Sequence, residues 1–245
     1  MADYRNNMAR FGTTASRAGT DIDEGLRSYM LKVYNYMALA LAVTGLAALG
    51  TYSLAASNPA FAQLIYASPL KWVVMLAPLA MVFFLSFRIN SMSVGAAQLS
   101  FWIYSALVGL SLSSIFLVFT GASITQTFFV TAASFGALSL YGYTTKRDLS
   151  AMGSFLIMGL FGLIIASLVN LFLQSSAMQF AISVIGVLVF AGLTAWDTQK
   201  IKNMYDYVAH DETMMGRSAI MGALSLYLDF INLFMFLLQF LGDRR

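Results

Sequence analysis

Two aspartates stand inside strongly apolar stretches of the chain, where a carboxylate is costly. Asp229 lies between Leu228 and Phe230, and Asp197 follows Trp196. Ionisable residues at such positions usually face the inside of a helix bundle or a water-filled cavity. Two carboxylates that meet in a medium of low dielectric cannot both ionise cheaply, so their protons belong to the pair. These residues therefore point to proton exchange and, once the proton has left, to attraction of a cation such as calcium, which takes oxygen ligands.

Asp229 also belongs to a polar stripe. The steps between its members are four, three, four, three and seven residues, which keeps them on one helical face: Ser218, Gly222, Ser225, Asp229, Asn232 and Gln239. Asp229 is ten residues beyond Ala219, or about 15 Å at 1.5 Å per residue, which is close to mid-membrane depth. We expect Ser225, Asn232 and Gln239 to face a pore. The alternative is a hydrogen-bonded packing seam through which no ion passes.

The partners of Asp229 are less certain from spacing alone. If the helix that holds Asp197 continues to Asn203, Asp197 lies about two turns inside its end and reaches the level of Asp229. The alternative is an ordinary interfacial acid paired with a nearby lysine. Arg88 closes the second apolar stretch, and its planar guanidinium could hold a carboxylate with two hydrogen bonds. An exposed Arg88 that only sets topology is the alternative there.

The elements that carry these residues are membrane-spanning helices. Hydrophobic residues make up 59% of the 245-residue chain and charged residues 10%, against roughly 25% charged in soluble domains. Seven apolar stretches approach the roughly 20 residues that a spanning helix needs, and they are too long for barrel strands. They are Val33 to Ala56, Trp72 to Phe87, Val94 to Thr120, Ile124 to Tyr143, Met152 to Leu173, Met178 to Asp197 and Ala219 to Leu241.

This pattern predicts an all-α integral membrane protein with one membrane domain, residues 31–245. Residues 1–30 are polar, and we interpret them as a flexible, uncleaved cytoplasmic tail, because a secretory signal would place its apolar core nearer the start. Only three residues separate the third and fourth stretches, which predicts a tight antiparallel pair of helices. Whether the seventh helix fully crosses the membrane stays open at this stage.

Several classes of function are disfavoured. The chain has no cysteine, and its single histidine, His210, lies in a polar stretch. Thiol catalysis is therefore excluded and a serine-type membrane protease is disfavoured. Two aspartates on adjacent helices could also serve an aspartyl protease, but neither sits in the Gly-x-Gly-Asp motif of such enzymes. The basic residues form no track for nucleic acid. We expect no enzyme, no cofactor and no nucleic-acid partner.

The stretch around Asp229, Ala223-Leu224-Ser225-Leu226-Tyr227-Leu228-Asp229-Phe230-Ile231-Asn232-Leu233-Phe234, resembles the signature of the Bax-inhibitor-one family, also called the transmembrane Bax inhibitor motif family. Two further stretches fit in order, Lys146-Arg147-Asp148-Leu149-Ser150 and Asp197-Thr198-Gln199-Lys200-Ile201. The resemblance covers nearly the whole chain after Leu31 and indicates a bacterial-type member.

The resemblance implies seven helices with the last one central and surrounded by the other six. It implies a pH-sensitive calcium leak in which Asp197 and Asp229 hold the pore shut, contact calcium transiently, and are engaged by Arg88. The expected partners are the lipid bilayer, calcium as the permeant ion, and a membrane-bound protease or other membrane protein. The alternative function is non-catalytic regulation of such a protease. The expected location is a bacterial inner membrane, with the amino terminus in the cytoplasm.

The distribution of Lys and Arg gives a testable topology, because cytoplasmic loops carry an excess of both. On this assignment eleven basic residues share the inner side: Arg5, Arg10, Arg17, Arg27, Lys32, Arg88, Lys146, Arg147, Lys200, Lys202 and Arg217. The chain lacks cysteine, so single cysteines report cleanly. We predict that Ser150→Cys is labelled by a membrane-impermeant thiol reagent only from the cytoplasmic side, and Ser68→Cys only from outside. The reverse pattern would refute the orientation.

Overall fold

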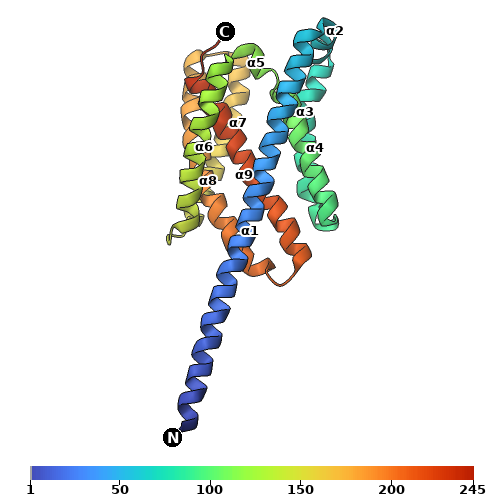
Figure 1. Ribbon diagram of the computed structural model, residues 1–245. Helices are drawn as coiled ribbons and strands as arrows, with labels where there is room; N and C mark the ends of the chain where they lie inside the picture. Colours follow the sequence, from blue (N-terminus) through green and yellow to red (C-terminus); the bar gives the residue numbers. More distant parts are fainter. Residues whose placement is uncertain (1) are drawn as a thin grey trace.

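Long helices make up nearly all of the computed structural model, which describes the backbone from Ala2 and the side chains of residues 24–245 (Figure 1). Residues 1–23 of the predicted tail lie outside the part of the chain whose side chains are described. Polar side chains begin several helices: Ser93, Thr120, Ser175 and Asp211 each accept a hydrogen bond from a backbone N–H of the first turn, as N-cap residues do.

In the described part of the chain the long helices are α1 (Ala2–Ser57), α3 (Leu70–Arg88), α4 (Val94–Leu112), α6 (Gly121–Thr144), α7 (Ser150–Leu173), α8 (Ser176–Val208) and α9 (Glu212–Leu241). Short elements join them: α2 (Pro59–Ala62), the π-helical turn η1 (Gln63–Ala67), the 3-10 turn η2 (Ile89–Ser91) and α5 (Ile115–Val118). Seven segments are long and apolar enough to cross a membrane, and each contains one of the seven predicted stretches or most of it. The all-α membrane fold is therefore confirmed.

The last helix, α9, forms the centre of the bundle. It packs against α8, α1, α6 and α4, and more of it is buried than of any other described span. The side chains of Leu226, Tyr227 and Leu238 are completely shielded. By contrast, α3 packs mainly against α4, and α7 mainly against α8. The predicted central position is thus observed, although four of the other six helices supply most of the contacts.

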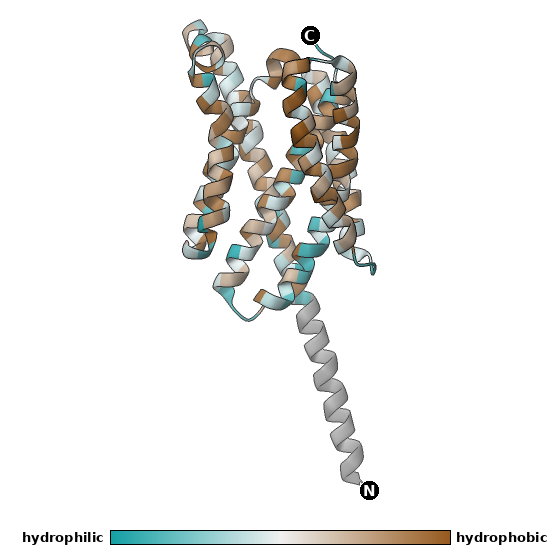
Figure 2. Cartoon of the chain, turned by 180° about the vertical axis from the view of Figure 1, so that it is seen from behind, coloured by the Kyte–Doolittle hydropathy of each residue, from teal (hydrophilic) through white to brown (hydrophobic). Residues whose placement is uncertain are grey.

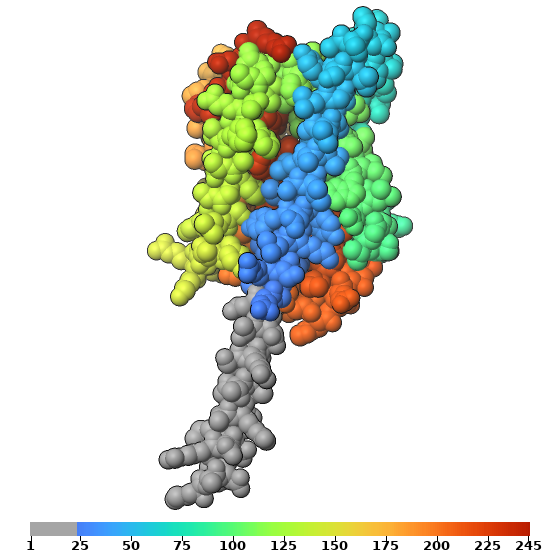
Figure 3. Space-filling view, viewed as in Figure 1, coloured from blue at the N-terminus to red at the C-terminus, as the bar shows by residue number. Residues whose placement is uncertain are grey.

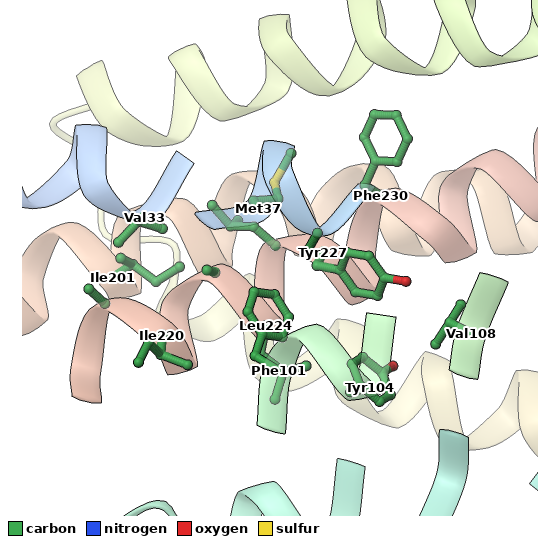
Figure 4. Packing of buried hydrophobic residues seen from close by; sticks show 14 of the residues in the cluster. Val33, Met37, Phe101, Tyr104, Val108, Ile201, Ile220, Leu224, Tyr227 and Phe230 are labelled. Atoms are coloured by element: carbon green, nitrogen blue, oxygen red, sulfur yellow. The ribbon is translucent and has the colours of Figure 1, made fainter. Parts of the chain in front are cut away.

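Two groups of buried side chains meet on α9. The larger combines residues of α1, α3, α4, α5, α6, α8 and α9, and the smaller joins α7, α8 and α9. In the larger group, Tyr227 points between α1 and α4, where its ring packs edge-on against Phe101 and Tyr104 (Figure 4). Its hydroxyl lies 2.7 Å from the Thr44 hydroxyl, which donates to the Ser105 carbonyl. A polar contact thereby ties three helices together inside an apolar core.

The outer surface of the bundle is strongly apolar, as a lipid-facing surface must be. Large side chains such as Phe161 and Phe172 on α7 and Trp72 on α3 are mostly exposed. Figure 2 shows the hydrophobic residues spread along the helices and hydrophilic residues gathered toward their ends. The carboxyl terminus lies at the end of the bundle opposite α1's beginning (Figure 1). Helix α9 therefore runs from one end of the bundle to the other, as a fully crossing seventh helix would.

Two expectations need correction. The third and fourth spans are not an antiparallel pair, because α4 packs on α1, α3 and α9 whereas α6 packs on α8 and α9. Helix α4 ends at Leu112, and the short helix α5 then carries the chain across the end of the bundle. There the Thr120 N–H donates a hydrogen bond to the Asp243 carbonyl. The packed domain also begins before residue 31, since Tyr29 and Met30 are buried in the core.

Candidate functional site

The two aspartates meet between α8 and α9, which share the largest helix–helix interface of the described chain. Helix α8 continues past Asn203 to Val208, so Asp197 lies about three turns inside its end. The carboxyl groups of Asp197 and Asp229 are close enough to influence each other's ionisation. A hydrogen bond between two carboxyl groups needs a proton on one of them. One proton held between the two carboxyl groups would satisfy this requirement.

Asp229 is the more deeply placed of the two. Its side chain is 4% exposed, and its Oδ2 atom is buried without a hydrogen-bond partner among the described residues. Asp197 is half-buried and lies nearer the end of the bundle where the chain begins. A buried polar atom without a partner is costly and usually marks strain or function. The hydrogen-bonding capacity of the aspartate pair is thus only partly used within the protein.

Small residues let the helices approach closely on both sides of the pair. A Cβ atom at Gly222 would lie 3.1 Å from the side chain of Ile201, so α9 and α8 touch there over a glycine. On the other side of α8, a Cβ at Gly142 of α6 would collide with the backbone carbonyl of Ala195, two residues before Asp197. Asp197 is therefore carried on a helix that is closely packed on both flanks.

Thr198, the neighbour of Asp197, faces a hydroxyl cluster. Its Oγ1 lies 2.9 Å from Ser139 Oγ on α6, which lies 2.6 Å from the Tyr34 hydroxyl on α1. The same Thr198 hydroxyl also donates to the Thr194 carbonyl. This cluster joins α1, α6 and α8 beside the carboxylate pair. Sequence reasoning did not find it, because Thr198 and Ser139 are 59 residues apart and the pattern of apolar stretches does not show which helices pack together.

Gln199 brings together two of the motifs singled out in the sequence. Its side-chain amide donates to the Arg147 carbonyl and accepts from the Leu149 N–H, both at 2.8 Å. It thereby fixes the loop between α6 and α7. Within that loop, hydrogen bonds from Ser150 to the exposed Asp148 carboxylate lower the pKa of Asp148. Asp148 consequently stays ionised near neutral pH, which makes it a poor pH sensor.

The cation that acts on both carboxylates is Lys200, one turn after Asp197. Its ammonium group also lies 5.0 Å from the centre of the Trp196 ring, in a cation–π position. Arg88, by contrast, is exposed at the end of α3, a helix that packs mainly on α4. The structure does not bring Arg88 to the pair, and the expected gating role of Arg88 gains no support from its position.

The residues of the predicted polar stripe lie in different surroundings and do not line one continuous cavity. Gln239 accepts hydrogen bonds from Gln179 Nε2 at 2.7 Å and Ser183 Oγ at 3.3 Å, at the end of the bundle that holds the carboxyl terminus. It lines a cavity of about 530 Å³ there. Asn232, one turn from Asp229, lines a hollow of about 300 Å³ beside α7. Ser225 is half-buried one turn on the other side of Asp229.

Comparison with known proteins matches nearly the whole chain. The family described as "Inhibitor of apoptosis-promoting Bax1" matches residues 26–245. An uncharacterized protein of Rickettsia prowazekii is 52% identical over the full length of both chains. A protein of Caulobacter vibrioides is 46% identical, again over the full length of both. The inner membrane protein YbhL of Escherichia coli is 49% identical over 90% of this chain and 94% of its own.

The Gln199 contacts give a testable stability effect. Gln199→Ala leaves the Leu149 N–H and the Arg147 carbonyl without their partner, and a buried unsatisfied group costs about 1–3 kcal/mol. We predict a lower thermal unfolding midpoint for this variant in detergent micelles. Asn203→Ala serves as the matched control, because Asn203 is exposed one turn further along α8. Equal midpoints for the two variants would show that Gln199 does not hold the loop.

Proposed function

Since this chain belongs to the family of inhibitors of apoptosis-promoting Bax1, we propose that it is a pH-sensitive calcium leak whose gate is the pair Asp197 and Asp229. The YbhL protein is named an inner membrane protein, and we place this chain in a bacterial inner membrane with its amino terminus in the cytoplasm. The proposal assigns no catalytic residue and no resident cofactor.

One observation carries the proposal. The Asp229 carboxyl group lies on the central helix, faces Asp197, and has one oxygen with no protein partner. A packing seam would be satisfied at lower cost by asparagine, which donates as well as accepts hydrogen bonds. A carboxyl pair has the further property that its charge changes with pH. This property is what a proton-controlled gate requires.

Hollows on both sides of the pair support a permeation path. Asn232 lines the hollow toward the carboxyl-terminal end of the bundle, and its wall shares Leu171 with the larger cavity at Gln239. On the other side, Trp196 and Lys200 line a hollow of about 270 Å³. The first hollow is lined by α7, α8 and α9 and the second by α7 and α8, and neither includes the aspartates themselves. In the proposed open state the carboxylate pair joins the two hollows.

The ligand set at the pair suits passage of calcium better than its storage. Calcium takes six to eight oxygen ligands in a tight site. Among the described residues, no group of three or more acidic or histidine side chains could form such a site. Two carboxylates attract a divalent cation and release it again. In the proposed cycle the shared proton bridges α8 and α9 in the closed state, and its loss leaves two like charges that separate the helices and admit calcium.

The carboxylate pair can be tested by calcium flux into liposomes loaded with a calcium dye, measured across a pH series. Asp229→Asn removes the shared titration but keeps size and hydrogen bonding, so the pH dependence of flux should flatten. Asp197→Asn should act nearly alike, and the double variant should add little, because residues that act as a unit are non-additive. Flux itself should fall in the double variant, which has no carboxylate to attract calcium.

Two results would contradict the proposal in different ways. If the double variant keeps its pH dependence, the sensor lies outside the pair. If the unmodified protein passes no calcium at any pH, the leak is wrong, and non-catalytic regulation of a membrane-bound protease becomes the better account.

Lys200 and Arg88 give a separate test of which cation acts on the gate. The positive charge of Lys200 favours the ionised pair, so Lys200→Gln should let the pair keep its proton to higher pH. We expect the midpoint of the flux curve to rise by at most roughly 0.7 pH unit, since even a direct exposed ion pair contributes no more than about 1 kcal/mol. Arg88→Gln, which removes a charge from the end of α3, should leave the midpoint unchanged. A shift in Arg88→Gln but not in Lys200→Gln would restore the assignment to Arg88.

A further inference from the structure

A groove separates α1 from α6 in the half of the bundle nearest Glu24. The two helices make few direct contacts along their length. In the space-filling view, dark red atoms of α9 show between them in the half of the bundle away from Glu24 (Figure 3). The groove has a volume of about 610 Å³, and its lining is mostly apolar. Met30, Met37 and Phe135 lie along it, and the exposed Leu31 and Leu140 stand at its rim.

The dimensions of the groove fit a chain from one leaflet. Along α1 it extends from Arg27 to Ala38, and along α6 from Tyr143 to Phe135. Eleven residues of helix span about 16 Å, and the hydrocarbon core of a bilayer is about 30 Å thick. The groove therefore extends about as far as one leaflet is deep. It opens toward the lipid, so an acyl chain can enter it from the side.

Basic side chains mark the end of the groove where a lipid headgroup would lie. Arg27 is exposed and lines the mouth. Lys202 reaches the same end, because its ammonium donates to the Tyr143 carbonyl at 2.8 Å and lies 5.1 Å from the centre of the Tyr143 ring. Glu24 lies one turn before Arg27 and lines an adjoining hollow, which Arg27, Leu31 and Lys32 also line. The charge at the mouth is complementary to a phosphate.

We propose that this groove binds an anionic glycerophospholipid, with one acyl chain between α1 and α6 and the phosphate held near Arg27 and Lys202. An apolar slot of one-leaflet depth with cations at its mouth matches the two parts of such a lipid, and each basic residue near an anionic surface contributes about fivefold in affinity. A zwitterionic lipid would fit the slot but would gain less from the two cations.

The bound lipid would also contact groups next to the carboxylate pair. Ser139 and Tyr34 line the groove and connect to Thr198, the neighbour of Asp197. At the far end Phe135 packs against Phe230, the neighbour of Asp229, at 5.5 Å between ring centres. Phe230 points toward α6 in Figure 4. An influence of the lipid on gating rests on the proposed function, whereas binding itself does not.

Binding is tested by native mass spectrometry of the full chain, titrated in micelles with phosphatidylglycerol or phosphatidylcholine of identical acyl chains. We expect the unmodified protein to retain phosphatidylglycerol at least about fivefold better. Arg27→Gln should lower that preference about fivefold. Arg88→Gln is the matched control and should leave that preference unchanged. Arg88 is also an exposed arginine at this end of the bundle, but it lies outside the groove.

Glycine variants test the slot itself. A Cβ at Gly136 meets nothing within 4 Å, so Gly136→Phe can place its ring in the groove and should abolish retention of both lipids. Gly162→Phe is the matched control, because Gly162 on α7 is equally open but lies outside the groove. If Gly136→Phe does not fold, Ala38→Phe narrows the slot from the α1 side.

Four outcomes would overturn the proposal. Equal retention of the two lipids by the unmodified protein would remove the headgroup site, and undiminished binding in both groove variants would place the lipid elsewhere. A lipid-free dimer that Gly136→Phe dissociates would show that a second copy of the chain occupies the slot. Excess free glycerol phosphate should not displace the lipid, and displacement would show that the acyl chain contributes nothing. None of these readings depends on calcium flux.

Discussion

A carboxyl group inside a helix bundle that stands in lipid has to find its partners within the protein, since water is scarce there. Among residues 24–245 Asp229 is the most deeply buried carboxyl group, and Asp197 is the partner beside it. The surrounding architecture follows from this requirement. The helix that carries Asp229 is central, the helix that carries Asp197 shares the largest interface with it, and small residues on α6 and α9 bring the backbones close.

The contacts around Asp197 explain why consecutive residues of one helix belong to a single unit. Thr198 joins the hydroxyl cluster of α1 and α6, Gln199 fixes the loop before α7, and Lys200 supplies the cation that faces the pair. Thr198 and Gln199 reach different neighbours of α8, whereas Lys200 packs on Trp196 of α8 itself. A displacement of α8 relative to α9 would therefore be transmitted to α1, α6 and the loop at the same time.

The sequence predicted the spans and the pair for physical reasons that do not depend on packing. Length and hydrophobicity identify a spanning helix, and a carboxylate within one is conspicuous, as Asp197 and Asp229 were. The spacing between two spans does not reveal which helices pack together. For this reason the link at Gly121 was misjudged, and neither the Thr198 cluster nor the groove beside Phe135 could be foreseen. Polar residues at 24–30 likewise concealed the buried Tyr29 and Met30.

The central claim is that the two aspartates hold one proton between them when the gate is closed. Infrared difference spectroscopy of the protein in liposomes, recorded across a pH series, measures that proton through the carbonyl stretch of a carboxylic acid. We predict one such band in the unmodified protein, and we expect it to disappear over the same pH range in which calcium flux rises. The pH difference spectra of Asp197→Asn and Asp229→Asn should both lack this band. A band that persists unchanged in either variant, or the absence of any band that follows the flux, would contradict the account.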